Sequence, residues 1–221
     1  MPRYRPSVII RLAALALVVG GFALDHLGGS GAGSAAAVQA TGTPAQMLLF
    51  KALPTPPDGS MAWAKVQSPT LRGVLDLDQF VQAYFDSAGQ ASGLTTEQQR
   101  GFQYAVRVDW QGDDGSYADA YIVHYSAASG ALAFYSGQLK VSTAGYTSAG
   151  QVSGITDSKL YTDSTLDSFG NASVKAWAVA GSNVISLYTL TPSQPGTEAA
   201  SRMIAAEYAA ICGAAGCPAA S

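Results

Sequence analysis

A pattern of alternating apolar and polar residues occurs twice in this chain, and it constrains the fold more than any other feature. In residues 102–110 (FQYAVRVDW) every second side chain is aromatic or branched, which is typical of a strand with one buried and one solvated face. The glycines and aspartates of residues 112–115 favour a turn, because both residue types tolerate positive φ. Residues 117–125 then supply the return strand, and residues 127–140 follow as a short amphipathic helix.

The second copy of the pattern lies near the end of the chain. Strands at residues 173–180 and 184–190 flank a Gly-Ser-Asn turn, and Pro192 ends the second strand. A helix at residues 197–211 follows. The apolar stripes predicted for the two helices are Leu132, Tyr135 and Leu139 in the first, and Ala200, Met203, Ile204, Tyr208 and Ile211 in the second.

Two hairpins that each have one apolar face need a cover, and the two helices can supply it. The sequence therefore predicts an α+β fold, in which an antiparallel sheet from two strand-turn-strand-helix units has its helices packed on one face. On this interpretation Gln103, Arg107 and Asp109 lie on the solvated face of the first strand.

Two helical segments are also predicted before the first hairpin. Residues 75–85 (LDLDQFVQAYF) form a helix with Asp76 or Asp78 as its N-cap. Residues 95–98 (TTEQ) are typical of the capped start of a short helical turn that leads into the first strand.

The N-terminus has the composition of an export signal. Arginines at positions 3, 5 and 11 precede an uninterrupted apolar run at residues 12–24. Because basic residues resist translocation, the segment should stay at the cytoplasmic side while the remainder crosses the membrane. Small residues at 35–37 and 38–40 offer two cleavage sites, so cleavage and retention as a membrane anchor both stay open.

The domain organisation follows from these features. Residues 1–27 are predicted to be a signal peptide or membrane anchor, and residues 28–43, rich in Gly, Ala and Ser, a flexible linker. Residues 44–221 are predicted to form a single extracytoplasmic α+β domain. A net charge of −3 with scattered basic residues argues against nucleic acid as a partner, since phosphate binding needs a basic stripe.

His124 is the main candidate for catalysis. Asp109, Asp119 and Ser126 are close in sequence, and a set of serine, histidine and aspartate suits nucleophilic catalysis. On an extended strand, however, Asp119 points to the face opposite His124, and Asp109 could approach only across the hairpin. The chain contains no GxSxG motif. We therefore assign no catalytic residue.

Metal and cofactor sites have little support in the sequence. Asp163, Thr165 and Asp167 alternate as in a calcium loop, but the glycine and the terminal glutamate of such a loop are missing. A solvated loop between strands is the preferred interpretation. No metal ligand, cofactor or cofactor-binding residue is assigned.

Cys212 and Cys217 are the only cysteines. An exported protein meets oxidising conditions, so we expect the two to form a disulfide that fastens the end of the last helix. A redox role would favour the tighter Cys-x-x-Cys spacing.

The three tryptophans could form a platform for carbohydrate stacking. Trp110 lies on the buried parity of its strand, which favours a core position, whereas Trp177 is ambiguous. Trp63 follows a proline-rich stretch and could be exposed.

Several structural motifs of the chain resemble those of uncharacterised exported or membrane-anchored proteins of actinobacteria. These motifs are the LDxFVxxYF pattern that ends at Phe85, Gly101-Phe102, Trp110, Asp114-Gly115, Tyr125, Gly130-Ala131 with Tyr135, Ser158 to Tyr161, and Thr191-Pro192. More distantly, the architecture resembles extracytoplasmic sensor-type domains of actinobacterial signalling proteins. The resemblance implies a module of the cell envelope and transfers no functional residue.

The sequence favours a non-enzymatic extracytoplasmic module that binds an unknown envelope protein or a small ligand. The expected binding surface is the groove between the two helices, or the solvated sheet face around Tyr117, Tyr121 and His124. The alternatives are an envelope hydrolase that uses His124 with Asp109 or Asp119, and a purely structural envelope protein. Contact with the membrane would come through the N-terminal segment if it is not cleaved.

Overall fold

The computed structural model describes residues 41–60, 71–213 and 217, which all lie within one compact unit. The signal or anchor segment at residues 1–27, nearly all of the linker at residues 28–43, and Trp63 lie outside these residues, so the expectations about them stay predictions. Within the described residues, no helix has the length and the apolar character needed to cross a membrane.

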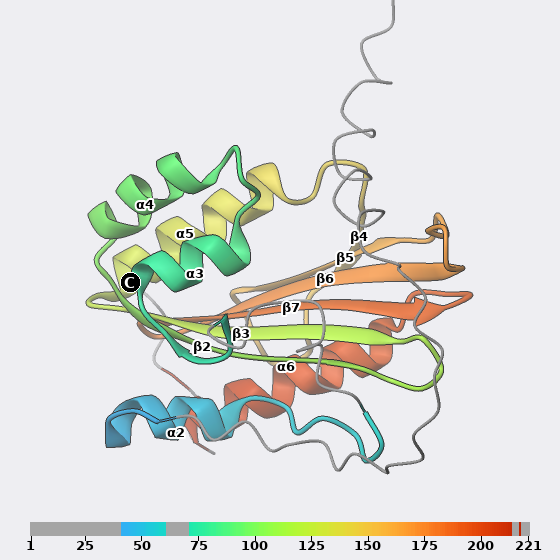
Figure 1. Ribbon diagram of the computed structural model, residues 1–221, viewed down its shortest axis with the longest axis horizontal. Coiled ribbons are helices and arrows are strands. Elements are labelled where there is room, and N and C mark those ends of the chain that lie inside the picture. Colours follow the sequence, from blue (N-terminus) through green and yellow to red (C-terminus); the bar gives the residue numbers. More distant parts are fainter. Residues whose placement is uncertain (1–40, 61–70, 214–216, 218–221) are drawn as a thin grey trace, which may run out of the picture. The chain divides into compact units, whose positions relative to one another are not determined.

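The described residues form five α-helices and one sheet of seven strands (Figure 1). In chain order these elements are α2 (Pro44–Ala52), β1 (Gly73–Leu75), α3 (Leu77–Tyr84), α4 (Gln90–Gln99), β2 (Phe102–Gln111), β3 (Tyr117–Tyr125), α5 (Ala128–Val141), β4 (Thr147–Gly150), β5 (Ser158–Asp163), β6 (Asn171–Ala180), β7 (Asn183–Pro192) and α6 (Thr197–Cys212).

The sheet has the order β1-β2-β3-β7-β6-β5-β4, and all neighbouring strands are antiparallel. The two hairpins expected from the sequence are β2–β3 and β6–β7, and β3 pairs with β7 to join them. The α+β class and the antiparallel sheet are therefore confirmed.

The placement of the helices differs from the sequence prediction. Helices α3, α4 and α5 cover one face of the sheet, whereas α2 and α6 cover the other (Figure 1). Two residues, 126 and 127, separate β3 from α5, but β7 is followed by the four residues 193–196. In that longer connection Ser193 adopts a φ of 69°, in the left-handed region, and the chain reaches the opposite face. Both faces of the central strands are consequently buried.

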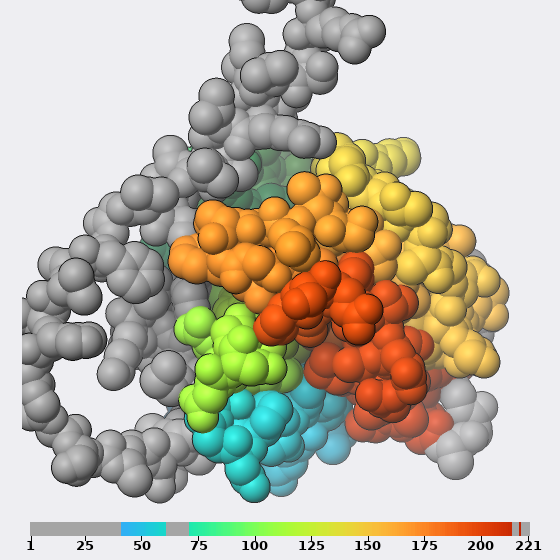
Figure 2. Space-filling model, turned by 90° about the vertical axis from the view of Figure 1, so that its right-hand side faces the viewer, coloured from blue at the N-terminus to red at the C-terminus, as the bar shows by residue number. Residues whose placement is uncertain are grey.

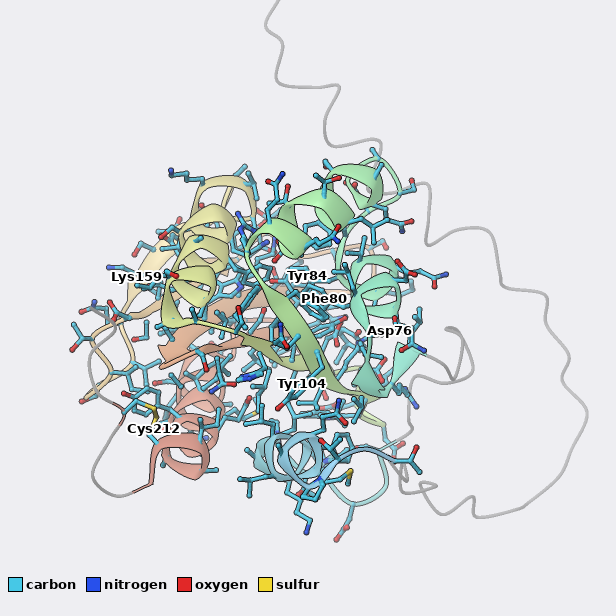
Figure 3. All side chains as sticks on the ribbon, turned by 90° about the vertical axis from the view of Figure 1, so that its left-hand side faces the viewer. Asp76, Phe80, Tyr84, Tyr104, Lys159 and Cys212 are labelled. Carbon is cyan, nitrogen blue, oxygen red and sulfur yellow. A yellow bond between two sulfur atoms is a disulfide. The ribbon has the colours of Figure 1, made fainter. Side chains whose placement is uncertain are left out.

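The face under α3, α4 and α5 is packed mainly with aromatic rings. Phe80 on α3 is fully buried, and its ring stacks on that of Phe102 with a centroid distance of 5.2 Å. Phe80 and Tyr84 point from α3 into this layer, while Asp76 lies at the start of the helix (Figure 3). Ring burial and ring-to-ring contacts together hold this layer on the sheet.

The face under α2 and α6 is packed mainly with aliphatic side chains. Ile122 on β3 pairs with Ile185 on β7, and both are fully buried beneath Ile204 of α6. Trp110 joins this cluster and is 6% exposed, so it is a core residue, as its strand parity predicted.

The starts of the helices are set by local hydrogen bonds. Helix α3 is capped by Asp76, whose carboxylate accepts from the backbone N–H of Gln79 at 2.9 Å. Helix α4, in contrast, begins at Gln90 and not at residues 95–98, so that prediction was wrong. The chain turns into α4 at Asp86, whose carboxylate accepts from the N–H of Gly89, which leaves the TTEQ stretch in the middle of the helix.

Candidate functional site

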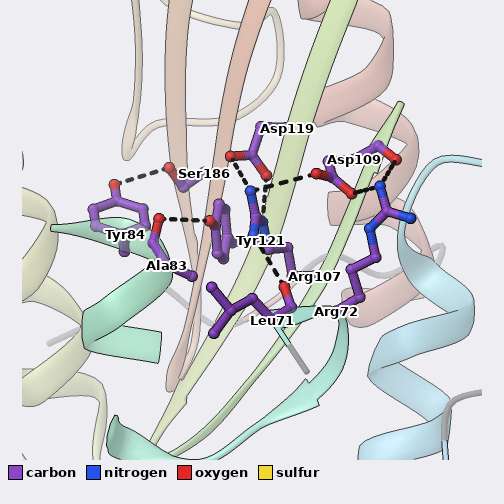
Figure 4. A network of polar contacts seen from close by, with 9 residues as sticks. All are labelled: Leu71, Arg72, Ala83, Tyr84, Arg107, Asp109, Asp119, Tyr121 and Ser186. Carbon is purple, nitrogen blue, oxygen red and sulfur yellow. Dashed lines mark hydrogen bonds and ion pairs between the residues drawn. The ribbon is translucent and has the colours of Figure 1, made fainter. Parts of the chain in front are cut away.

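A network of four charged side chains lies on the α3 face of strands β2 and β3 (Figure 4). Arg107 is 1% exposed, and its Nε and one terminal nitrogen donate to the two oxygens of Asp119 at 2.8 and 3.0 Å. Its other terminal nitrogen donates to the carbonyl of Leu71 at 3.0 Å. The guanidinium carbon also lies 5.1 Å from the ring centroid of Tyr121, a cation–π distance.

Asp109 is the second carboxylate of the network and has no exposed side-chain surface. Its two oxygens lie 2.5 Å from Arg72 and 3.5 Å from Arg107 as ion pairs, without accepting a well-aligned hydrogen bond. Since Asp109 and Asp119 are directly opposed in the β2–β3 ladder, their like charges would repel without the two arginines.

The network balances two carboxylates with two guanidinium groups, and of these four side chains Asp119 keeps the most solvent exposure, at 15% of its side chain. Burial raises the pKa of Asp119, and the charge and hydrogen bonds of Arg107 oppose that shift. A bidentate guanidinium pair holds a carboxylate in its ionised form. We interpret the network as a structural connection between the sheet, α3 and the segment before β1. It corrects the prediction that Arg107 and Asp109 lie on a solvated face.

His124 lies on the opposite face of β3 from Asp119. Its Nδ1 is 2.9 Å from the side-chain oxygen of Asn183, and its ring lies 4.9 Å from that of Tyr104. Within the described residues no carboxylate lies within ion-pair distance of the imidazole. Ser126 follows the end of β3, where its backbone N–H donates to the carbonyl of Gly101. The set proposed for a hydrolase, His124 with Asp109 or Asp119, is therefore not assembled.

The two surfaces expected to bind a partner are also absent. Helices α5 and α6 lie on opposite faces of the sheet, so there is no groove between them. Tyr121, expected on a solvated face, is 3% exposed beneath α3, where its hydroxyl donates to the carbonyl of Ala83 at 3.3 Å. Tyr117 lies on the same face as Tyr121 and not on that of His124.

The remaining sequence candidates have structural contacts. Cys212 and Cys217 are joined by a disulfide at the end of α6. Asp163 and Asp167 accept backbone N–H groups in the loop between β5 and β6. In the part of the chain that is described, no three His, Cys, Asp or Glu residues are grouped as metal ligands. Trp177 is buried at 3% exposure, and its Nε1 donates to the hydroxyl of Tyr84 at 3.2 Å.

A pocket lies between α6 and the end of α2 with the residues that follow it. Its volume is about 470 Å³, which is within the range of small-molecule sites. Helix α2 and the residues that follow it lie directly beside α6 (Figure 2). The lining is mainly apolar and consists of Ala52, Leu53, Pro54, Thr55, Ala199, Arg202, Met203, Ala206 and Glu207.

Glu207 is the unusual residue of this α2–α6 pocket. It is 1% exposed, and neither of its carboxyl oxygens has a hydrogen-bond partner among the described residues. Burial raises its pKa well above the ordinary value of 4.5. The other charged residue in the wall, Arg202, is largely exposed and pairs with Glu198 on the outer side of α6. A buried polar group without a partner costs stability, and native proteins retain few groups of this kind.

Sequence reasoning missed Glu207, although a signal was present. The residue is three positions after Ile204 and seven after Ala200, so it lies on the stripe that was predicted to be buried. Its charge kept it from being counted there. A charged residue on an otherwise apolar helical stripe was the available sign.

No known protein family has a model that matches this chain, and no curated protein matches it. Among solved structures, the chain is similar to the extracellular domain of PknH from Mycobacterium tuberculosis, with 15% sequence identity and a TM-score of 0.41. The similarity covers 61% of this chain and 74% of that domain. At this degree of likeness the comparison assigns neither a family nor a function.

Proposed function

We propose that the protein is a non-enzymatic binding module that works outside the cytoplasm and takes up a small ligand in the α2–α6 pocket. The observation that carries this proposal is the unpartnered carboxyl of Glu207 in the wall of an apolar pocket. Natural proteins retain few such groups, because each one lowers stability without a compensating bond.

The arrangement of the other reactive groups also supports binding over catalysis. The carboxylates of Asp109 and Asp119 face arginines, and His124 contacts Asn183. A general base needs to reach the proton that it removes, and none of these three groups faces the pocket.

The proposed location outside the cytoplasm rests on the basic and apolar N-terminus and on the disulfide of Cys212 with Cys217. Fusion of alkaline phosphatase to the C-terminus tests it, since this enzyme becomes active only after export. We expect activity from the wild-type fusion and its loss when residues 12–24 are deleted. An inactive wild-type fusion would contradict the proposed location.

The binding role can be tested by thermal unfolding of the full-length protein against a set of small cationic, neutral and anionic amphiphiles. A ligand of the native state raises Tm according to its concentration and affinity. We expect at least one class to raise Tm, and the change Ala206→Trp, which fills the pocket, to abolish the shift. Equal shifts in both proteins would place binding elsewhere.

Two further measurements address the alternatives. Ester hydrolysis that is lost in His124→Ala would support an enzyme. Gel filtration at two concentrations would support a structural protein if the elution volume moved toward larger species at the higher concentration.

A further inference from the structure

The chemistry of the α2–α6 pocket restricts what it can bind. The walls formed by Ala52, Leu53 and Pro54 on one side and by Met203 on the other are apolar, so they favour a ligand with an apolar body. Glu207 belongs to the wall, and its carboxyl oxygens are buried without a partner among the described residues, so a ligand reaches them only by displacing the side chains that cover them. A ligand that satisfies this pocket therefore combines hydrocarbon with one complementary polar group.

The complementary group is identified by the charges around Glu207. On α6, Arg202 is engaged with Glu198 on the exposed side of the helix. Helix α2 contributes no charged residue to the wall, because Lys51 is exposed and does not line the pocket. The sheet beneath α6 presents buried apolar residues such as Ile185. Among the described residues, none supplies a cation to Glu207.

We propose that the α2–α6 pocket binds a small molecule with an apolar body and a single primary ammonium group, which forms an ion pair with the Glu207 carboxylate. This inference deepens the proposed binding function and rests on it. An ammonium group offers three N–H donors and a positive charge, which satisfy the two carboxyl oxygens that are unpartnered in the free protein.

Binding of this ligand is coupled to release of a proton. Because burial raises the pKa of Glu207, the free protein holds the proton on this carboxyl above pH 4.5. The ammonium ligand binds the ionised form, so the carboxyl proton passes to solvent as the ion pair forms. Affinity should therefore increase with pH, by up to about tenfold per unit, between the ordinary and the raised pKa of Glu207.

The test uses three matched probes on the full-length protein, namely 4-phenylbutylamine, 4-phenylbutanol and 4-phenylbutyrate. Isothermal titration measures the Kd of each probe at several pH values. We expect the amine to bind at least tenfold more tightly than the alcohol and the carboxylate, and its affinity to rise with pH. The change Glu207→Gln should weaken the amine at least tenfold, remove its pH dependence and leave the affinity of the alcohol within a few-fold.

A matched control is Asp78→Asn, which removes an exposed carboxylate of α3 that does not line the pocket. It should leave the affinity for the amine unchanged, and Tm of each variant verifies that it is folded. If the alcohol binds in the pocket as tightly as the amine, the inference is wrong while the proposed binding function stands. Amine binding that is unchanged in Glu207→Gln overturns the inference as well. If Ala206→Trp leaves all three affinities unchanged, the proposed function fails together with the inference.

Discussion

The two faces of the sheet bury charge in different ways. Under α3, the charges of Arg107, Asp109 and Asp119 are paired with one another and with Arg72. Under α6, a single carboxyl, that of Glu207, is buried among apolar side chains with no partner among the described residues. The same sheet thus holds one network in which every charge faces an opposite charge and one buried carboxyl without a partner among the described residues.

If the proposed function holds, this difference separates structural from functional burial of charge. Charges that satisfy each other can fix how β2 and β3 meet α3, and removal of one member leaves the others unpaired. An acid that is buried alone lowers stability until something binds it. We therefore expect substitutions at the two sites to change the free energy of unfolding in opposite directions.

The largest effect is expected from the charged network. The change Arg107→Leu removes the bidentate partner of Asp119 and one neighbour of Asp109. We expect the free energy of unfolding to fall by about 3–5 kcal/mol, as is usual when one member of a buried ion pair is deleted. Urea unfolding monitored by tryptophan fluorescence measures it.

The double change Arg107→Leu with Asp119→Leu sharpens this prediction, because it leaves Asp109 with its pair to Arg72. It should recover a substantial part of the lost stability. As a control, Arg202→Ala deletes an exposed pair on α6 and should change stability by less than about 1 kcal/mol. A loss in Arg107→Leu no larger than in this control would show that the network is not structural.

A gain in stability, opposite to the loss above, is expected when Glu207 is replaced. The change Glu207→Leu replaces an unpartnered buried carboxyl by an apolar side chain of similar size, so unfolding should cost about 1–3 kcal/mol more. The same urea experiment at pH 7 measures the gain. A loss of stability instead would show that the carboxyl has a partner in solution.

The pH dependence gives an independent check on Glu207. Its folded-state pKa is raised above the ordinary value of 4.5, so the native state binds more protons than the unfolded state between these two values. Stability must then fall as pH rises through that window, with a slope of up to about 1.4 kcal/mol per pH unit. The difference in stability between the wild type and Glu207→Gln, followed from pH 4 upward, should show this slope.

The sequence predicted the secondary structure of the central sheet well but misjudged the faces. The alternation at residues 102–110 identified the strand correctly, whereas Arg107 and Asp109 were taken as solvent-facing because charged side chains normally are. The turn between β2 and β3 would have aligned Asp109 with Asp119 across the hairpin, and two opposed carboxylates require a cation nearby. That register argument points to Arg107 without a structure.

Other features could not be obtained from local patterns. Whether α6 covers the same face as α5 depends on how residues 193–196 leave the sheet, and the left-handed φ of Ser193 is not encoded by a characteristic residue type. The pocket depends on contact between α2 and α6, which are far apart in the chain. Periodicity determines which residues share a face but not which distant element covers it.

A smaller effect is expected from the disulfide at the end of α6. The disulfide of Cys212 with Cys217 closes a short loop at the end of the helix, and chain entropy gives at most about 2 kcal/mol for so short a loop. We expect the double change Cys212→Ser with Cys217→Ser to lower the free energy of unfolding by that amount or less. Reduction of the wild type should reproduce the loss, and a loss above about 4 kcal/mol would contradict a role limited to the end of α6.

The smallest effect is expected at the helix caps, where α2 on one face of the sheet can be compared with α3 on the other. Helix α2 begins with a capping box of Thr43 and Gln46, and α3 begins with one of Asp76 and Gln79. Each cap satisfies backbone N–H groups that are otherwise unpaired, so Thr43→Ala and Asp76→Ala should each cost about 1 kcal/mol. Urea unfolding of both variants, with the conservative Thr43→Ser and Asp76→Asn as controls, measures the two caps on one scale.

A cost limited to Asp76→Ala would indicate that α2 can fray while the rest of the fold persists. In that case ligand binding in the α2–α6 pocket, whose wall includes the end of α2, should reduce the fraying, and hydrogen exchange of the α2 amides with and without 4-phenylbutylamine would detect it.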